Sequence, residues 1–422
     1  MIRQLRGLTP RQRHAFAAAF LGWSLDSFDF FILVFCVSAI AADFHVRTAA
    51  VFEALFLTLA FRPVGAFLFG ALADRYGRRP ALMLNIACYS VLELSCAFAG
   101  SLHTLLWLRA LFGIAMGGEW GVGAALAFET LPTERRGFFS GVLQEGYAVG
   151  YLAAAAIYAL LFPHFQHMHW LGHTIGWRGM FAVGSVPALL VVYIGLKVEE
   201  SPVWRTAQET RRAAVSLTQT QKKTALIAGI RKYAPRFLYL ILLMTGFNAF
   251  SHGTQDVYPT FLQHGHHFSV QLTGSVAIIY TLGALFGGIF FGTLSERIGR
   301  KRAILAATLL TLPIIPLYAL SHSLIPLAIG AFLMQFMVQG AWGVIPAWLT
   351  ELSPGPVRAT FPGLAYQLGN LITSGNSVIQ AKAAERFGGF GPVLAVTVLL
   401  VTCFLALVVS FGKESRGTEL TV

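Results

Sequence analysis

The chain of 422 residues consists largely of long apolar runs separated by short polar connections. A bilayer core of about 30 Å needs roughly 20 consecutive apolar residues in a helix. Backbone groups must be paired inside hydrocarbon, and these runs are too long and too evenly apolar for barrel strands, so they predict helices. Twelve runs meet the requirement, at 14–41, 49–72, 81–99, 104–128, 139–163, 177–197, 234–262, 269–293, 303–320, 325–349, 358–383 and 391–412. The pattern therefore predicts an all-α integral membrane protein.

The two halves of the chain resemble each other in sequence. A shift of 222 residues places GALADRYGRR at 70–79 on GTLSERIGRK at 292–301, and it also places Glu129 on Glu351. Several matches at one offset indicate a duplication. The longest polar stretch separates six predicted helices from six more. We therefore expect three parts, which are an N-terminal six-helix bundle at 1–197, a cytoplasmic central loop at 198–233 and a C-terminal six-helix bundle at 234–422.

Composition and charge add an orientation to this picture. Hydrophobic residues make up 56% of the chain. Charged residues make up only 12%, against roughly 25% in soluble domains. The formal net charge of +12 would suit nucleic acid, but most of the 31 Lys and Arg lie in the N-tail, the even-numbered connections and the C-tail. This is the positive-inside pattern of a multi-pass inner (plasma) membrane protein with both termini in the cytoplasm. We expect the basic face to meet anionic lipid headgroups, and we expect no nucleic-acid partner.

The element G-x-L-x-D-R-x-G-R-R, between the second and third predicted helices, resembles the signature loop of the major facilitator superfamily. The resemblance covers nearly the whole chain. It implies the major facilitator fold, in which two six-helix bundles surround a central cavity. It also implies that the loop and its repeat form an ionic latch at a cytoplasmic gate. The alternative is that these charges only set the orientation of the chain in the membrane. The residues expected in this gate are Asp74, Arg75, Arg78, Glu296, Arg297 and Arg300.

Ionisable side chains inside the predicted helices need an explanation, because a charge at the bilayer centre costs about 2.5–3.5 kcal/mol even on a lenient scale. These residues are Asp26, Asp29, Arg62, Glu93, Arg109, Glu119, Glu145, His252 and Asp256. Counting the helical rise from each helix end places Asp29, Glu119 and His252 near mid-bilayer. The same count places Arg109 and Asp256 in the outer half, at similar depth. The superfamily resemblance implies that helices 1, 4, 7 and 10 line the cavity, so polar residues on helices 1, 4 and 7 indicate one central site.

The seventh predicted helix carries the segment NAFSHGTQDVYPT at 248–260. It is similar to the pattern N-x-x-[ST]-H-x-[ST]-Q-D-x-x-x-T of Jen-like lactate and pyruvate permeases, within the sialate:proton symporter family. The match implies proton-coupled uptake of short monocarboxylates by alternating access. Sialate carriers of that family often have extra central helices, which this chain lacks. A larger acid, such as sialate or a dicarboxylate, is the alternative substrate, and a membrane sensor with a transporter fold is the alternative from another class.

The chemistry of an organic acid sets what the site must contain. The acid is an anion at neutral pH, and moving its charge inward against 100 mV costs about 2.3 kcal/mol. A co-transported proton cancels that charge, so the site needs a cation and a group that titrates. Arg109 is the expected carboxylate partner because its planar guanidinium stays protonated, and a permanent bridge to an aspartate is the alternative. The other residues expected to bind substrate are Asn248, Ser251, His252 and Gln255, with helix–helix hydrogen bonding as the alternative.

Proton coupling is assigned to the buried titratable groups. The candidates are Asp29, Asp26, Glu119, His252 and Asp256. The imidazole of His252 titrates near neutrality in water. A substrate anion bound to Arg109 would release a competing carboxylate, which would then take up a proton more readily. We expect Arg62, Glu93 and Glu145 to form structural ion pairs or gate contacts.

The sequence predicts no cofactor, no metal site and no enzymatic activity. The four cysteines lie in apolar runs without metal-type spacing, and the histidines of the outer loops, at 164–173 and 264–267, are irregularly spaced. We interpret these histidines as solvated, with a zinc or pH sensor as the alternative. The expected functional unit is a monomer in the lipid bilayer, and its partners are a small organic anion and protons.

Overall fold

The computed structural model of the protein describes residues 7–170, 173–213 and 219–420. The elements of the first half are α2 (Pro10–Asp43), α3 (Thr48–Tyr76), α4 (Arg78–Ala97), α5 (Leu102–Met116), α6 (Glu119–Thr130), η1 (Thr133–Arg135), α7 (Arg136–Gln144), α8 (Gly146–Phe165), β1 (His169–Trp170), β2 (His173–Thr174), α9 (Gly176–Val183) and α10 (Ala188–Lys197). The elements that follow are α11 (Pro202–Ala213), α12 (Gln219–Gln255), α13 (Tyr258–Thr260), η2 (Phe261–Gly265), α14 (Val270–Ile298), α15 (Arg300–Leu309), η3 (Leu312–Ile314), η4 (Pro316–Leu320), α16 (Leu324–Trp342), α17 (Ile345–Leu352), η5 (Gly355–Val357), α18 (Thr360–Thr373), α19 (Asn376–Arg386) and α20 (Phe390–Ser410).

The helices account for all twelve predicted membrane spans. Within the described ranges, ten helical segments are long and apolar enough to cross a membrane. The other two spans are α12, which carries the polar stripe, and the broken helix formed by α18 and α19, whose parts have 14 and 11 residues. The all-α fold prediction is therefore confirmed. One small departure is an antiparallel hairpin in which strands β1 and β2 have two residues each.

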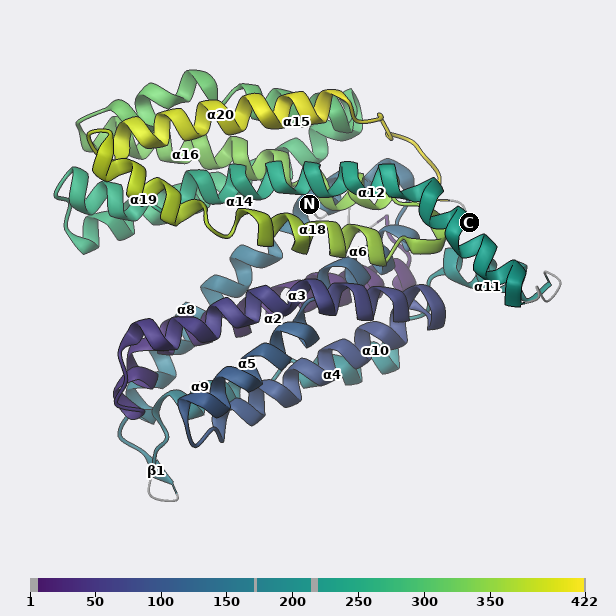
Figure 1. Ribbon diagram of the computed structural model, residues 1–422, viewed down its shortest axis with the longest axis horizontal. Helices are drawn as coiled ribbons and strands as arrows, with labels where there is room; N and C mark the ends of the chain where they lie inside the picture. Colours follow the sequence, from purple (N-terminus) through teal and green to yellow (C-terminus); the bar gives the residue numbers. More distant parts are fainter. Residues whose placement is uncertain (1–6, 171–172, 214–218, 421–422) are drawn as a thin grey trace.

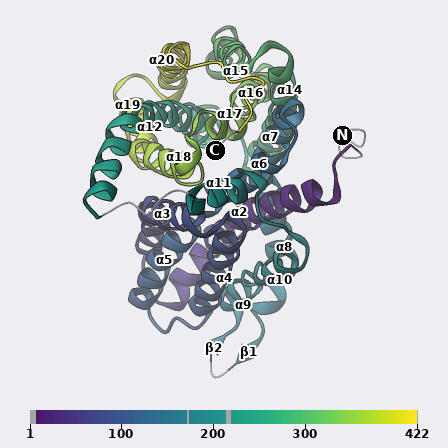
Figure 2. The same cartoon turned by 90° about the vertical axis from the view of Figure 1, so that its right-hand side faces the viewer.

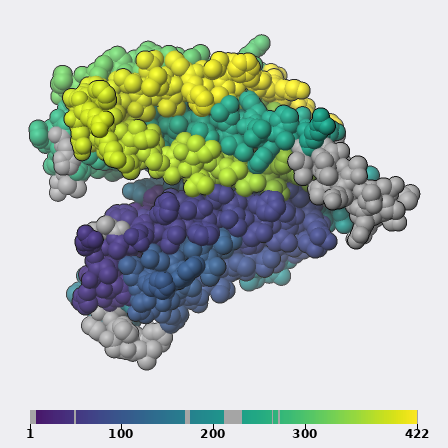
Figure 3. Space-filling model, viewed as in Figure 1, coloured from purple at the N-terminus to yellow at the C-terminus, as the bar shows by residue number. Residues whose placement is uncertain are grey.

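The helices gather in two bundles, one formed by α2–α10 and the other by α12–α20 (Figure 1). The bundles meet at the end marked by α11, which we call the α11 end. Residues near both ends of the described chain also lie there, next to the start of α7. Gly7 lies against the Arg135 side chain, and the Thr418 carbonyl accepts a hydrogen bond from Arg136. At the opposite end, marked by the β1–β2 hairpin, the bundles diverge and leave an open cleft between them (Figure 3). We call this the hairpin end.

The outer surface of both bundles is apolar. Leu189 is 69% exposed, Ile325 is 71% exposed and Leu196 is 77% exposed. Water would not tolerate so many large exposed apolar side chains, whereas the hydrocarbon of a bilayer would. This surface places the protein in a membrane as a multi-pass protein.

Two equivalent glycines make the tight turns that begin α4 and α15. Gly77 has a φ of 116° and Gly299 has a φ of 97°, and L side chains rarely adopt such angles. The two positions are 222 residues apart, so the repeat in sequence is also a repeat in backbone conformation. Each turn sets an arginine, Arg78 or Arg300, at the first position of the helix that follows.

Candidate functional site

A cavity of about 460 Å³ lies between the two bundles, at the base of the cleft seen in Figure 3. Its walls come from α2, α3, α7 and α8 on one side and from α12, α14, α16 and α18 on the other. The polar residues that line it are Ser27, Arg62, Gln144, Glu145, Tyr147, Tyr151, Asn248, Ser251, His252, Gln255, Asp256, Tyr280, Thr281, Gln335, Gln339, Tyr366 and Asn370. The fourth predicted helix, now α5 and α6, contributes no lining residue, so its expected place in the cavity wall is wrong for this structure.

Four aromatic rings pack together on the side of the cavity that faces the α11 end. Tyr366 lies at the centre, with ring centroids 6.4 Å from Trp23, 5.1 Å from Trp120 and 5.8 Å from Trp342. The indole nitrogens of Trp23 and Trp342 are buried and have no hydrogen-bond partner among the described residues. A buried donor without a partner is unfavourable, so these two N–H groups carry an unmet demand for an acceptor.

The arginine in the cavity wall is Arg62. Its Nη2 donates to Asp26 Oδ2 at 2.7 Å, and the two residues are 5% and 1% exposed. The expectation of a structural ion pair for Arg62 is therefore met, and Arg62 is also a lining residue of the cavity. A guanidinium is the side chain best suited to hold a carboxylate, so Arg62 is the better anion partner in this structure.

Arg109 does not reach the cavity, which corrects its expected contact with substrate. It is fully buried inside the first bundle, where its guanidinium donates to the carboxylate of Glu93 and lies 3.4 Å from the Cys96 sulfur. The ring of Phe112 covers it at 4.0 Å. The permanent-bridge alternative thus describes the geometry, although the partner is Glu93 and not an aspartate. Helix α5 packs against α3 and α4, and this packing turns the side chain away from the other bundle.

Asp29 and Glu119 also lie behind the cavity wall and not in it. Asp29 is 0% exposed and Glu119 is 1% exposed, and their four carboxyl oxygens have no hydrogen-bond partner within the described ranges. Glu119 packs against Gly22 of α2. An unpaired ion in such a place is very unfavourable, so each carboxyl is a group that would hold a proton.

The polar stripe of α12 faces the cavity over its whole length, as predicted. The stripe consists of Asn248, Ser251, His252, Gln255 and Asp256. His252 Nδ1 lies 3.2 Å from both carboxyl oxygens of Asp256, and its Nε2 lies 3.2 Å from Asn370 Oδ1. Ser377 also donates to Asp256 at 2.9 Å. Asn370 of α18 and Ser377 of α19 were not predicted, because neutral polar residues are too common along the chain to be distinguished.

The first copy of the loop motif holds the two bundles together at the α11 end. The Asp74 carboxylate accepts hydrogen bonds from the backbone N–H groups of Ala359 and Thr360, each at 3.1 Å, and from the Thr360 hydroxyl at 2.6 Å. It therefore caps the N-terminus of α18 in the other bundle. Arg78 lies 3.0 Å from Asp74 and 2.9 Å from Glu129, and all three of these ionic side chains are buried.

The second copy of the motif makes the reciprocal contact. Glu296 accepts a hydrogen bond at 2.8 Å from the backbone N–H of Phe138, near the N-terminus of α7 in the first bundle. Arg300 pairs with Glu351 at 3.0 Å. Glu296, Arg300 and Glu351 lie 222 positions after Asp74, Arg78 and Glu129. Phe138 lies 222 positions before Thr360. These contacts between the bundles favour the ionic latch over the alternative that the charges of the motif only set the orientation of the chain in the membrane.

Two of the expected gate residues take no part in the latches. The side chains of Arg75 and Arg297 are exposed, and the Arg75 guanidinium lies over the Tyr76 ring at 5.1 Å. Each arginine follows directly after the latch carboxylate, and one residue of helix turns a side chain by about 100°, so both point outward. Sequence reasoning missed Glu129 and Glu351 as gate residues, although the repeat had aligned them.

Glycines allow the bundles to approach closely beside the latches. Helices α7 and α14 form one seam and α3 and α18 the other (Figure 2). A Cβ at Gly141 would collide with the Gly288 carbonyl oxygen. A Cβ at Gly121 of α6 would lie 2.9 Å from the Gly363 Cα. These contacts close the α11 end.

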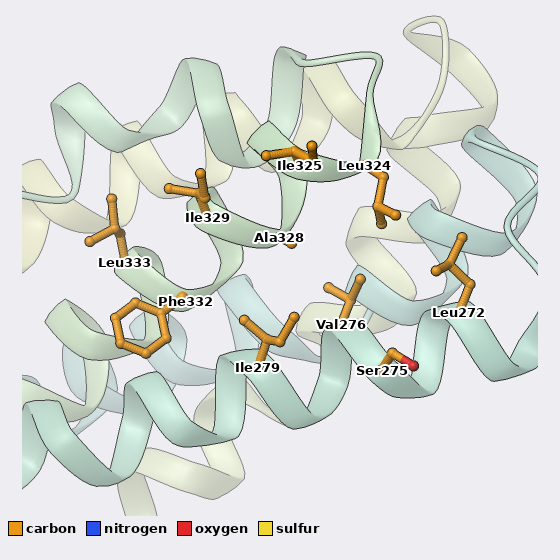
Figure 4. Close-up of a pocket in the computed structure, with 10 residues that line it drawn as sticks. All are labelled: Leu272, Ser275, Val276, Ile279, Leu324, Ile325, Ala328, Ile329, Phe332 and Leu333. Atoms are coloured by element: carbon orange, nitrogen blue, oxygen red, sulfur yellow. The ribbon is translucent and has the colours of Figure 1, made fainter.

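A second cavity, of about 420 Å³, lies between α14 and α16 (Figure 4). Apolar side chains line it, with Ser275 as the one polar lining residue. It contains no charged group, so it offers nothing to hold an anion.

The outer-loop histidines do not form a metal site within the described ranges, where no group of three His, Cys, Asp or Glu side chains could hold an ion. The side chains at 169, 173 and 264 lie outside the description. His266 lies near His322, with ring centroids 6.2 Å apart. Burial, together with His322 and His267, lowers the pKa of His266 below its usual value.

Comparison with known proteins gives the family. Residues 16–236 match the family described as Sugar (and other) transporter, and residues 241–420 match the Major Facilitator Superfamily. The chain therefore belongs to the major facilitator superfamily, whose members are transporters and not enzymes. Its fold is similar to that of the proton:xylose symporter XylE, with a TM-score of 0.74 at 19% identity over 97% of this chain and 98% of the other.

Three relatives in sequence carry names of transporters for organic acids or lactones. A "Probable 4-methylmuconolactone transporter" of Cupriavidus pinatubonensis is 30% identical over 98% of this chain and 93% of its own. A "Carboxylic acid transporter protein homolog" of Saccharomyces cerevisiae is 28% identical over 92% of this chain and 64% of its own. The sialic acid transporter NanX of Escherichia coli is 28% identical over 98% of both chains.

Proposed function

We propose that this transporter is a proton-coupled symporter that takes up short monocarboxylates, such as lactate and pyruvate, by alternating access. One observation carries the proposal, which is that a single cavity is lined by a basic residue from each bundle, and each of these basic residues is paired with a carboxylate. Arg62 pairs with Asp26 on one side, and His252 pairs with Asp256 on the other. Each pair combines a cation for a carboxylate with an acid that can bind a proton.

The substrate carboxylate binds Arg62 in place of Asp26. A guanidinium bonds well to only one carboxylate along a given edge, so the arriving anion displaces Asp26. Asp26 is then a buried carboxylate without its cation, and protonation removes the cost of that charge. Anion binding and proton binding are thereby coupled, and the complex carries no added charge across the membrane.

The second bundle supplies the remaining contacts. His252 has an oxygen beside each ring nitrogen, an arrangement that a protonated imidazolium satisfies fully. The stripe residues Asn248, Ser251 and Gln255 offer amide and hydroxyl groups to the hydroxyl or keto oxygen of the substrate. Trp23 and Trp342 also line the cavity, and a shift of their rings would bring the buried, unpartnered indole N–H groups to the substrate. We assign Asp29 and Glu119 to holding protons behind the cavity wall, where their carboxyl oxygens have no hydrogen-bond partner among the described residues.

Orientation follows from charge. The α11 end holds Gly7 and Thr418, near the two ends of the described chain, together with most of the basic residues, so we assign it to the cytoplasmic face of the inner (plasma) membrane. The hairpin end faces outside, and this structure is therefore open to the outside. The bundles at 1–197 and 234–422 rock about the site, joined by the central loop at 198–233, of which 214–218 lie outside the description. A monomer contains the whole site.

The choice of a short acid rests on the helix-7 pattern and on the related yeast protein named as a carboxylic acid transporter homologue. A larger acid is the second candidate, favoured by the likeness to a sialic acid transporter along nearly the whole chain. A dicarboxylate would need a cation for each of its carboxylates, and Arg62 and His252 could supply them.

Transport into proteoliposomes tests the proposal. Purified protein is reconstituted, and radiolabelled lactate uptake is measured with and without an inward proton gradient. We expect concentrative uptake only with the gradient, competition by pyruvate and weak competition by sialate. Strong uptake of sialate with none of lactate would support the second candidate. Lactate uptake that ignores the gradient would contradict proton coupling.

A further inference from the structure

Glu145 is an acid in the cavity wall that the proposed cycle does not use. It stands at the break between α7 and α8, where it ends one helix and precedes the other. It is 6% exposed and lines the cavity. Its Oε1 has no hydrogen-bond partner among the described residues, and no ion pair to it is found there. The expected ion pair for Glu145 is therefore not formed in this structure.

The burial of this carboxyl depends on the opposite bundle. A Cβ on Gly288 of α14 would overlap Glu145 Oε1, so the carboxyl fits against bare backbone across the α7–α14 seam. The residues of α14 and α16 that line the cavity beside it, Tyr280, Thr281 and Gln339 among them, are uncharged. On the side of its own bundle, Trp23 and Gln144 are also uncharged. Among the described residues no cation pairs with the carboxylate, because Arg62, the arginine in the same cavity wall, is paired with Asp26. Closing the seam therefore favours the neutral acid.

The repeat supplies an internal comparison. A shift of 222 residues places Glu145 on Gln367 of α18, in the other seam. Gln367 is 2% exposed, and its Oε1 likewise has no partner in the described part of the chain. A neutral amide of the same length therefore fills the equivalent slot in the second seam. Packing alone does not require an acid at Glu145.

We propose that Glu145 is a proton-binding residue of the transport cycle, and that separation of α7 from α14 controls its release of the proton. With the α11 end closed, the carboxylate takes a proton from cavity water, which reaches it from the hairpin end. When the seam parts, water of the α11 end hydrates the carboxyl, the O–H bond breaks and the proton leaves to that water. The acid is thus exposed to one side of the membrane at a time. This inference rests on the proposed symport function.

The test separates coupling from folding and substrate binding. Glu145→Gln keeps the shape of the side chain and removes its titration. Two assays are run in the same proteoliposomes, which are lactate accumulation driven by a pH gradient of one unit, and lactate counterflow at equal pH. A gradient of one unit supports at most about tenfold accumulation per proton. The wild type, with protons on both Asp26 and Glu145, should exceed that limit, whereas Glu145→Gln keeps only the proton on Asp26, so its accumulation should fall to about tenfold or less while counterflow is retained.

Gln367→Leu is the matched control, because it alters the equivalent seam without touching a titratable group. We expect it to keep the ratio of accumulation to counterflow seen in the wild type. Glu145→Asp should restore part of the accumulation. Accumulation by Glu145→Gln that equals that of the wild type overturns the inference, and so does loss of both activities, which is what a packing role predicts. A wild-type protein that ignores the gradient contradicts the proposed function and this inference together.

Discussion

Opposite effects of substitutions at the two ends of one ion pair provide the sharpest test of the site. Arg62 and Asp26 are both buried and lie 2.7 Å apart. In the proposed cycle the substrate competes with Asp26 for the guanidinium. Arg62→Gln removes the cation that both carboxylates need, whereas Asp26→Asn removes only the competitor. The first change should therefore weaken lactate binding and the second should strengthen it.

The magnitudes follow from the geometry. Truncating one partner of a buried, hydrogen-bonded charge pair costs about 2–5 kcal/mol, so Arg62→Gln should weaken binding roughly 30- to 5000-fold. A hydrogen bond to a charged group contributes about 1.5–3 kcal/mol, which the substrate no longer has to replace in Asp26→Asn. Binding should then tighten by about 10- to 150-fold, and its dependence on pH should largely disappear. Protonation of the orphaned Asp26 keeps Arg62→Gln folded.

Scintillation proximity binding of radiolabelled lactate to purified protein, at pH 5.5 and pH 7.5, measures both changes. Arg75→Gln is the control, because it removes an equal charge from an exposed position outside the cavity and should bind as the wild type does. Weaker binding in Asp26→Asn, comparable to that in Arg62→Gln, would refute the competition between substrate and aspartate.

Two further changes probe the closed α11 end. The Asp74 carboxylate accepts three hydrogen bonds from Ala359 and Thr360, and Asp74→Asn weakens them. A cysteine at Ala359, which contributes only its backbone N–H, should then react several-fold faster with a membrane-impermeant maleimide in inside-out vesicles. An unchanged rate would argue against the latch. Gly141→Val places a side chain where the Gly288 carbonyl lies, so it should prevent closure of the α11 end. Both uptake and counterflow should fall at least tenfold. Near-normal counterflow would contradict the close contact of α7 with α14 during transport.

Periodicity was sufficient to predict the helices and the polar face of α12, whereas the latches around Asp74 and Glu296 were expected from the family resemblance of the repeated loop motif. The reason is that each pattern either lies within a single helix or occurs in both halves of the chain. The polar residues of α12 recur every four positions, which fixes their common side, and Asp74 and Glu296 are marked by the same ten-residue motif. Where a pattern repeats at helical spacing, direction as well as position can be predicted.

For a single charged residue on an apolar helix, the sequence could not predict whether the side chain points toward the cavity or into its own bundle. Arg62 and Arg109 lie on helices that are apolar on nearly every face, so no amphipathic stripe indicates which side is inward. The charged partner decides the direction, and Asp26 and Glu93 are distant in sequence from the arginines that they hold. For Glu145 the expected alternatives were an ion pair or a gate contact, and only the contact is present, because its neighbour across the seam is Gly288, which offers no charge.

The reciprocity of the two latches bears on how such a molecule arose. Asp74 caps a helix of the second half, and Glu296 caps the equivalent helix of the first half. In a symmetric homodimer, residue i of the first subunit contacts residue j of the second, and residue i of the second contacts residue j of the first. Such an interface is called isologous. The single chain therefore retains the interface of two identical six-helix subunits that were later fused. After fusion each copy could diverge separately, which is how one half came to hold the arginine pair and the other the histidine pair.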